Sequence, residues 1–140
     1  MRILLLGSSL LLLATLAAAC GEEEFAISAV QTNSPVEPNE FANVTAQVGT
    51  GAVCILKVGE IVNSDGKEIP RTLPPKSPNH AGVVTFRFGI PQTATPQAVP
   101  VNLSCVKNNV TVEAGATVEV GKRTKPFRTP LPTASPTPTP

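Results

Sequence analysis

The sequence contains no tryptophan and no tyrosine, and its single methionine is the first residue. Because five phenylalanines are the only aromatic residues, the core of any fold must consist mainly of Val, Ile, Leu, Ala and Phe. Charged residues make up 15% of the chain, against about 25% in ordinary soluble proteins. The 11 Lys+Arg and 10 Asp+Glu residues give a net charge of +1. This balance argues against a nucleic-acid-binding protein that relies on bulk charge.

Residues for catalysis are equally scarce. His80 is the only histidine and lies in a loop-like stretch, and Asp65 is the only aspartate. A catalytic triad needs a nucleophile, a base and an orienting acid, and no phosphate loop or pair of catalytic carboxylates is evident. Glu60, Asp65 and Glu68 lie near one turn, but a solvated turn fits them better than a calcium site. We therefore expect neither an enzyme nor a bound cofactor or metal.

The N-terminus has the pattern of a secretory signal. Met1-Arg2 supplies a positive charge, an apolar run follows from Ile3 to Leu16, and small residues precede Cys20. The alternative is an uncleaved anchor, since the apolar stretch is at the short end of what spans a bilayer. Removal of residues 1–19 from the 140-residue chain leaves about 120 residues, enough for one ordinary domain.

The segment Ala17-Ala18-Ala19-Cys20-Gly21 resembles the lipobox of bacterial lipoproteins. That resemblance implies that Cys20 carries acyl chains such as palmitate and becomes the first residue of the mature protein. It departs from the usual pattern in having Ala17 three residues before the cysteine, where leucine is common. The alternative is ordinary cleavage after Ala19, which would leave a free thiol. The linker 20–24 is short, so a lipidated protein would hold its domain close to the membrane.

From residue 25 to residue 120 the pattern indicates short β-strands. The clearest, Gly82–Ile90, alternates apolar and polar residues, and Asp65-Gly66 is typical of a tight turn. No segment has a helical period, so seven or eight strands predict an antiparallel sandwich. Pro100 lacks an N–H group, which places it at the start of a strand or on an edge. The expected strands are Phe25–Val30, Phe41–Val48, Val53–Val58, a short one at Ile61, Gly82–Ile90, Val99–Cys105, Val110–Val112 and Thr117–Val120.

Cys54 and Cys105 are expected to form a disulfide. Both fall on the apolar faces of predicted strands in a chain with an export signal, and Cys20 is assigned to the lipid. Metal binding is the weaker alternative, because it needs more ligands and no C-x-x-C motif is present.

These features resemble the small immunoglobulin-like domains of bacterial surface lipoproteins. The resemblance lies in Gly51–Val58, in Gly82–Phe88, and in Thr95-Pro96 leading to Val101–Cys105. It implies an immunoglobulin-like sandwich of about seven strands over residues 25–120. Phe86 and Phe88 occupy positions where tryptophans are expected, so the domain is not of the antibody type.

Residues 121–140 differ in composition from the rest of the chain. Lys122, Arg123, Lys125 and Arg128 form a basic cluster, and a Thr/Pro-rich end follows. We expect a disordered tail, because such a segment cannot bury enough apolar surface. Its basic cluster could contact anionic wall polymers or lipid headgroups, its Thr/Ser-Pro run could carry glycans, or it could have no partner.

The sequence therefore predicts an extracytoplasmic lipoprotein, anchored to a bacterial cell membrane, with a non-catalytic interaction module. Its partner would be an envelope protein or a glycan, and we expect the protein to be a monomer that does not bind nucleic acid. The loops 63–81 and 91–98 are the first candidates for contact, and the exposed sheet edges would suit strand addition. The alternatives are an accessory or solute-capturing lipoprotein of a transporter or enzyme complex, and a structural envelope component that acts through its tail.

Overall fold

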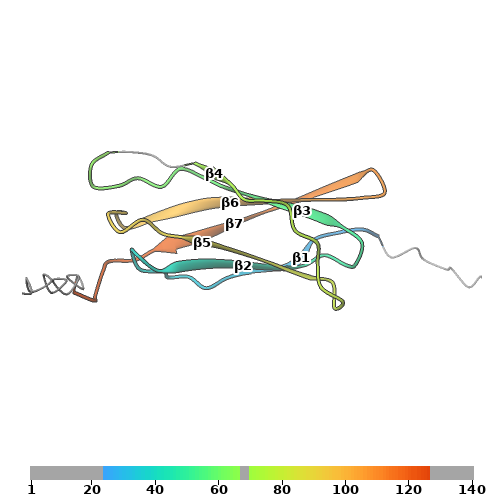
Figure 1. Cartoon of the computed structure of the whole chain (residues 1–140), viewed down its shortest axis with the longest axis horizontal. Coiled ribbons are helices and arrows are strands. Elements are labelled where there is room, and N and C mark those ends of the chain that lie inside the picture. Colours follow the sequence, from blue (N-terminus) through green and yellow to red (C-terminus); the bar gives the residue numbers. More distant parts are fainter. Residues whose placement is uncertain (1–23, 67–69, 127–140) are drawn as a thin grey trace, which may run out of the picture.

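The protein folds into two antiparallel β-sheets that pack face to face (Figure 1). The computed structural model describes residues 24–66 and 70–126. One sheet has the strand order β1-β2-β5, and the other has the order β4-β3-β6-β7. These residues form no helix, and their seven strands in two antiparallel sheets confirm the predicted all-β, immunoglobulin-like sandwich. Its strands are β1 (Ser28–Thr32), β2 (Phe41–Gln47), β3 (Val53–Val58), β4 (Arg71–Thr72), β5 (Val83–Gly89), β6 (Gln97–Lys107) and β7 (Val110–Val120).

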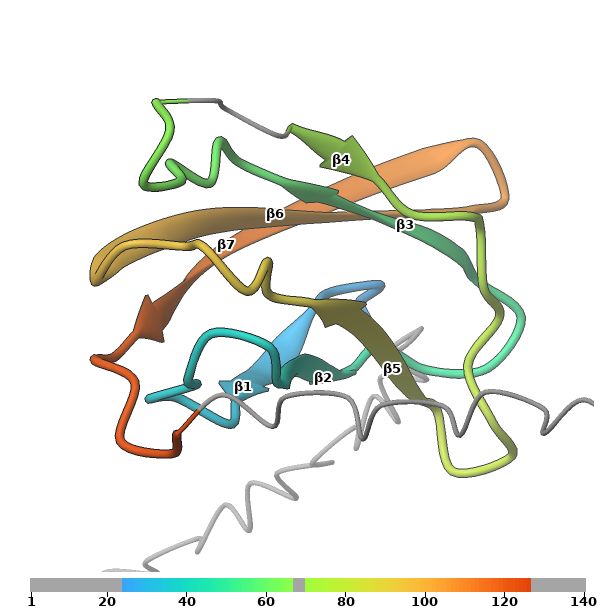
Figure 2. The ribbon, with the colours of Figure 1, turned by 60° about the vertical axis from the view of Figure 1, so that its left-hand side comes forward.

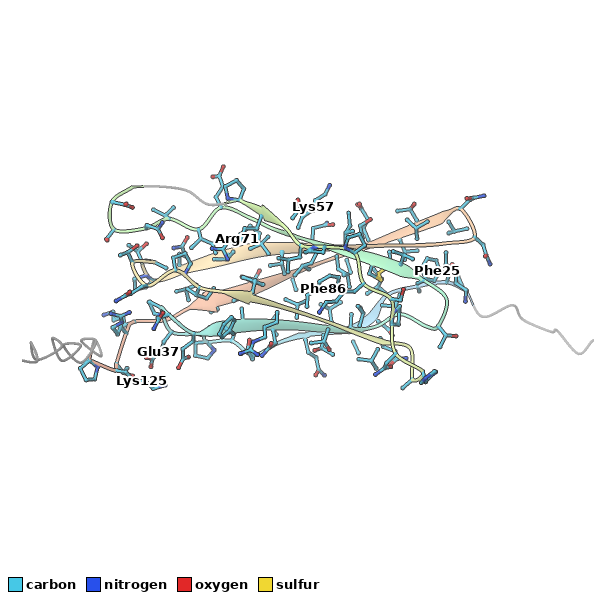
Figure 3. The ribbon with its side chains drawn as sticks, viewed as in Figure 1. Phe25, Glu37, Lys57, Arg71, Phe86 and Lys125 are labelled. Atoms are coloured by element: carbon cyan, nitrogen blue, oxygen red, sulfur yellow. A yellow bond between two sulfur atoms is a disulfide. The ribbon has the colours of Figure 1, made fainter. Side chains whose placement is uncertain are left out.

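The core lies between the two sheets and follows the predicted alternation of side chains. Every second residue of a strand points to the same face, so one apolar set from each strand is buried. Phe86 of β5 is the largest of the fully buried side chains and lies near the middle of the sandwich (Figure 3). Three of the predicted strand segments each bury four alternate residues, which are Ala42, Val44, Ala46 and Val48; Val84, Phe86, Phe88 and Ile90; and Val99, Val101, Leu103 and Cys105.

Four strand predictions differ from the structure. The strand expected at Phe25–Val30 lies at Ser28–Thr32. Ile61 is buried but forms no strand, and the short strand β4 lies instead at Arg71–Thr72, where it pairs with the end of β3. The two predicted segments at residues 110–112 and 117–120 form one continuous strand, β7, through Gly115. Gly115 is tolerated within a strand because β6 pairs with β7 along its whole length.

Pro100 lies inside the central strand β6 rather than at a strand start or on a sheet edge, so that prediction is wrong. The structure shows why the proline is tolerated. The nitrogen and carbonyl of Pro100 point toward β3, and the pairing of β3 with β6 ends at Val58 and Val101, one residue before the proline is reached. Beyond that point, the Pro100 carbonyl accepts a hydrogen bond of 2.8 Å from the N–H of Gly59. A Cβ on Gly59 would lie 2.7 Å from the Pro100 ring, so only glycine fits there.

The predicted disulfide between Cys54 and Cys105 is present and fully buried. It joins neighbouring strands of one sheet, because Cys54 of β3 lies directly opposite Cys105 of β6. The backbone N–H and C=O of Cys54 bond to Lys76 on the other side of β3. The two cysteines therefore form a non-hydrogen-bonded pair, in which opposed side chains come closest.

The two ends of the described chain lie at opposite ends of the long axis. Phe25 lies at one end, and Glu37 and Lys125 lie at the other (Figure 3). We call the end that holds the β1–β2 and β5–β6 loops, residues 59–66 and residues 121–126 the distal end (Figures 1 and 2). The described part of the chain contains no helix that could cross a membrane. The predicted signal segment and Cys20 lie outside the described residues.

Candidate functional site

Two loops are joined at the distal end by the side chain of Gln97. The Gln97 Nε2 atom donates a hydrogen bond of 2.8 Å to the Val62 carbonyl, and Gln97 Oε1 accepts one of 2.9 Å from the Val62 N–H. The backbone N–H of Ser64 also bonds to the Thr93 carbonyl at 2.8 Å. The amide side chain of Gln97 thus pairs with Val62 as a neighbouring strand would, which fixes the β3–β4 loop against the β5–β6 loop.

Residues 121–126 bond back onto the same end of the domain. Arg123 donates to the carbonyl of Gln92 at 3.3 Å, and the N–H of Thr124 donates to Glu37 Oε2 at 3.2 Å. The Thr124 hydroxyl also donates to the Glu37 carboxylate. Lys125 Nζ lies 2.6 Å from Glu40 Oε1 in an ion pair. We call these contacts of residues 123–125 the C-terminal clasp.

The clasp shifts the pKa values of its charged groups. Hydrogen bonds from Thr124 lower the pKa of Glu37, and the hydrogen bond from Lys125 lowers the pKa of Glu40. The bond to Glu40 raises the pKa of Lys125. Because the pKa values of both carboxyl groups are lowered in the closed clasp, the stability that the two carboxylates contribute is fully present above the ordinary carboxyl pKa. This stability is lost as the pH falls through the lowered pKa values. The Lys125 contribution is lost only as the pH rises through its raised pKa, so both contributions are present at neutral pH.

We predict that Thr124→Ala raises the pKa of Glu37 toward its ordinary value, because the variant loses the side-chain hydrogen bond that contributes most to the shift. A ¹³C NMR titration of the glutamate carboxyls of both proteins measures this change. Thr93→Ala is the matched control, since Thr93 lies at the same end of the domain and outside the clasp. An unchanged Glu37 pKa in Thr124→Ala would contradict the clasp.

Two adjoining depressions lie at the distal end and share Pro38, Gln92 and Arg123. The first, which we call the clasp depression, has a volume of about 290 Å³ and is lined by both carboxylates of the clasp. The second, which we call the loop depression, has a volume of about 390 Å³ and has no carboxylate in its lining. The wall of the loop depression combines hydroxyl, amide and proline groups with two cations, from Pro38, Ser64, Gln92, Thr93, Ala94, Thr95, Pro96, Lys122 and Arg123.

The structure divides the predicted contact loops between the two ends of the domain. Residues 63–66 and the predicted loop 91–98 meet at the distal end, where Asn63 forms an isolated β-bridge with Ala94. The later part of the predicted loop 63–81 runs back along β3. His80 therefore lies in the turn before β5, at the opposite end of the sandwich. Among residues 24–66 and 70–126, no group of His, Cys, Asp or Glu side chains could hold a metal ion.

Three of the four predicted basic residues lie near the loop depression or in the clasp. Lys122 is exposed and lines the loop depression, Arg123 lines both depressions, and Lys125 pairs with Glu40. Arg128 lies outside the described residues. Glu37, Glu40 and Gln97 are not among the site residues predicted from the sequence. The only sequence signal for the two glutamates is their position just before a strand, in a chain with few acids.

The described arrangement can bind a ligand through hydroxyl and amide hydrogen bonds and through positive charge. Lys122 offers an ammonium group beside Thr93, Thr95 and Ser64, without a competing carboxylate in the lining. Hydroxyl and amide groups pair well with sugar hydroxyls, and a cation pairs with a carboxylate or phosphate. The loop depression is thus the better candidate for a binding site.

No protein-family model matches the sequence, and no curated protein matches it. Solved structures with a similar fold include Salmonella alpha-2-macroglobulin reacted with methylamine, with a TM-score of 0.58 and 9% identity over 70% of this chain and 10% of that chain. The native conformation of E. coli alpha-2-macroglobulin has the same TM-score of 0.58 and 9% identity over 73% of this chain and 10% of that chain. The chain spans about a tenth of the length of these proteins. At this identity the likeness shows the fold alone.

Proposed function

We propose that this chain is an extracytoplasmic lipoprotein of a bacterial cell envelope and that its sandwich is a non-catalytic interaction module. Cys20 carries the lipid, and the distal end binds an acidic glycan of the envelope. One observation carries the proposal: the loop depression, with its hydroxyl and amide groups and the cations Lys122 and Arg123, lies at the end of the domain opposite Phe25. A lipid on Cys20, close to Phe25 in the chain, would leave that end directed away from the membrane.

Two further features support this function. The buried Cys54–Cys105 disulfide fits an oxidising compartment outside the cytoplasm. The loop depression is open at the end of one small domain, whereas small-molecule sites enclose most of their ligand. An open surface with hydroxyls and cations suits one stretch of a polymer better than a small solute.

We predict that Lys122→Ala weakens binding of polygalacturonate, a soluble polymer of acidic sugars, by about threefold to fivefold. One exposed charge pair contributes up to about 1 kcal/mol, which corresponds to that factor. Isothermal titration calorimetry at low salt measures the affinity, and added salt should weaken it because exposed charges are screened.

Lys57→Ala is the matched control, because Lys57 is an exposed lysine on the outer face of β3 and lies outside both depressions. The control removes the same charge and should leave the affinity unchanged. Equal losses in both variants, or equal binding of neutral dextran, would contradict a glycan site in the loop depression.

A further inference from the structure

The sandwich has four sheet edges, and in the described residues three of them are irregular, flanked by prolines or covered by side chains. A free edge presents unpaired N–H and C=O groups that can pair with another chain. Beside β4, the chain carries Pro70, Pro74 and Pro75, which have no N–H to offer. Strand β1 is short, and its register with β2 shifts between Ser28 and Gln31. Such irregular edges are poor templates for pairing.

The edge of β5 is covered by side chains. Lys76 Nζ donates to the Thr85 carbonyl at 3.0 Å, and Arg71 Nη1 donates to the Gly89 carbonyl at 2.9 Å. The N–H and C=O of Val83 both bond to Asn79, at 3.0 and 2.9 Å. An incoming strand would have to displace these groups.

The edge of β7 is covered only over its second half. The carbonyl of Glu119 accepts a hydrogen bond of 2.8 Å from the N–H of Val36, and the Glu119 N–H bonds to Ser34 Oγ at 2.9 Å. The Thr117 carbonyl accepts a hydrogen bond of 3.4 Å from the Thr32 hydroxyl. Alternate residues of a strand direct their backbone groups to the same side. Thr111, Glu113 and Gly115 therefore present their N–H and C=O groups to this edge as well, and no described residue pairs with them.

The first half of β7 also lies apart from β1 in space. Figures 1 and 2 show the tip of the β6–β7 hairpin separated from β1. Gly115 adds no side chain to shield the backbone, and a Cβ there would meet nothing closer than 3.9 Å. We call the backbone groups of Thr111, Glu113 and Gly115 the open β7 edge.

We infer that the open β7 edge binds an extended segment of another envelope protein by strand addition. On the inner face, Val112 and Ala116 are apolar and only partly buried, as is Val30 of β1, a strand that contacts β7. On the outer face, Glu113 is exposed. The matching segment alternates apolar residues, which face inward, with polar residues that include Lys or Arg opposite Glu113.

A second copy of this chain fits the edge poorly. Antiparallel pairing of two open β7 edges through all three residues would place the exposed Glu113 of one copy directly opposite Glu113 of the other. Like charges in directly opposed positions destabilise a strand pair. The assignment of the partner to the envelope rests on the proposed function, whereas the open edge itself does not.

The test uses the purified full-length chain and an eight-residue peptide in which Val alternates with Lys. Hydrogen exchange at single-amide resolution should show about tenfold slower exchange at Thr111, Glu113 and Gly115, with no change along β5. Glu113→Pro removes an edge N–H that β6 does not use, and should weaken binding about tenfold. Thr85→Pro, at the blocked β5 edge, is the matched control and should bind normally.

A charge exchange keeps the test decisive if the proline variant does not fold. Glu113→Lys should weaken binding of the Val/Lys peptide and restore tight binding to a Val/Glu peptide. The inference is overturned if a peptide with its Val and Lys residues in two separate blocks binds equally well, or if no amide is protected at about 1 mM peptide. It is also overturned if anionic vesicles protect these amides and the peptide does not. Lipid attachment and polygalacturonate binding are measured separately, so their failure is distinguishable from a failure here.

Discussion

Replacing both bridged cysteines, Cys54→Ala with Cys105→Ala, is expected to lower the free energy of unfolding by about 4 kcal/mol. The bridge closes a loop with a sequence separation of 51 residues, and cross-links of that span stabilise by about this amount. For a domain of about 100 residues the melting temperature should fall by about 15 °C or more. Urea unfolding followed by circular dichroism, with thermal melts, measures both quantities.

Ser104→Ala is the control for the cysteine variants. Ser104 is the neighbour of Cys105 in β6 but points to the opposite face of the sheet and is half-buried. We expect its effect to stay within about 0.5 kcal/mol, as for most surface substitutions. A double cysteine variant as stable as the native protein would mean that the bridge is dispensable for the fold.

Phe86→Ala is expected to cost about 3–5 kcal/mol of unfolding free energy. The Phe86 ring has 1% of its surface exposed and is the largest of the fully buried side chains. It extends from β5 into the core between the sheets, and the chain has no tryptophan or tyrosine to fill the cavity. Denaturant unfolding of the variant measures the loss, and the fraction folded at 25 °C shows whether the domain still folds.

Phe41→Ala provides the comparison for Phe86→Ala, because it removes the same side chain at a position where 51% of the surface is exposed. Phe41 stacks under Arg87, whose guanidinium carbon lies 3.9 Å from the ring centre. Loss of this exposed contact should cost about 1 kcal/mol or less. Similar costs at Phe41 and Phe86 would contradict the placement of the core between the sheets.

Most of the sandwich is readable from the sequence because its strands bury one face. Val84, Phe86 and Phe88 alternate with polar residues, and this period fixes both the strand and the side that is buried. The disulfide was predictable for the same reason, since Cys54 and Cys105 occupy buried positions of two such strands. The local sequence pattern therefore predicts a strand and its buried face wherever buried and exposed residues alternate along the chain.

The remaining features depend on contacts between distant residues. Thr124 and Glu37 are 87 positions apart, and nothing local to either residue predicts their hydrogen bond. Pro100 is tolerated in a central strand only because β3 ends beside it, which follows from the register of another strand. Similarly, β4 is two residues long and arises from pairing with β3 rather than from its own pattern. The clasp and the position of β4 are therefore not predictable from local sequence patterns.

The intact mass of the native protein, extracted from membranes of its host without reduction, tests the proposed anchored domain most directly. We predict a chain that begins at Cys20, carries two or three acyl chains, and has a mass lower by two hydrogen atoms because of the Cys54–Cys105 bridge. Hexose-sized increments would add glycosylation of the tail to this account. An unmodified mass beginning at Cys20, or a mass that still includes residues 1–19, would contradict the lipid anchor and the outward direction of the distal end.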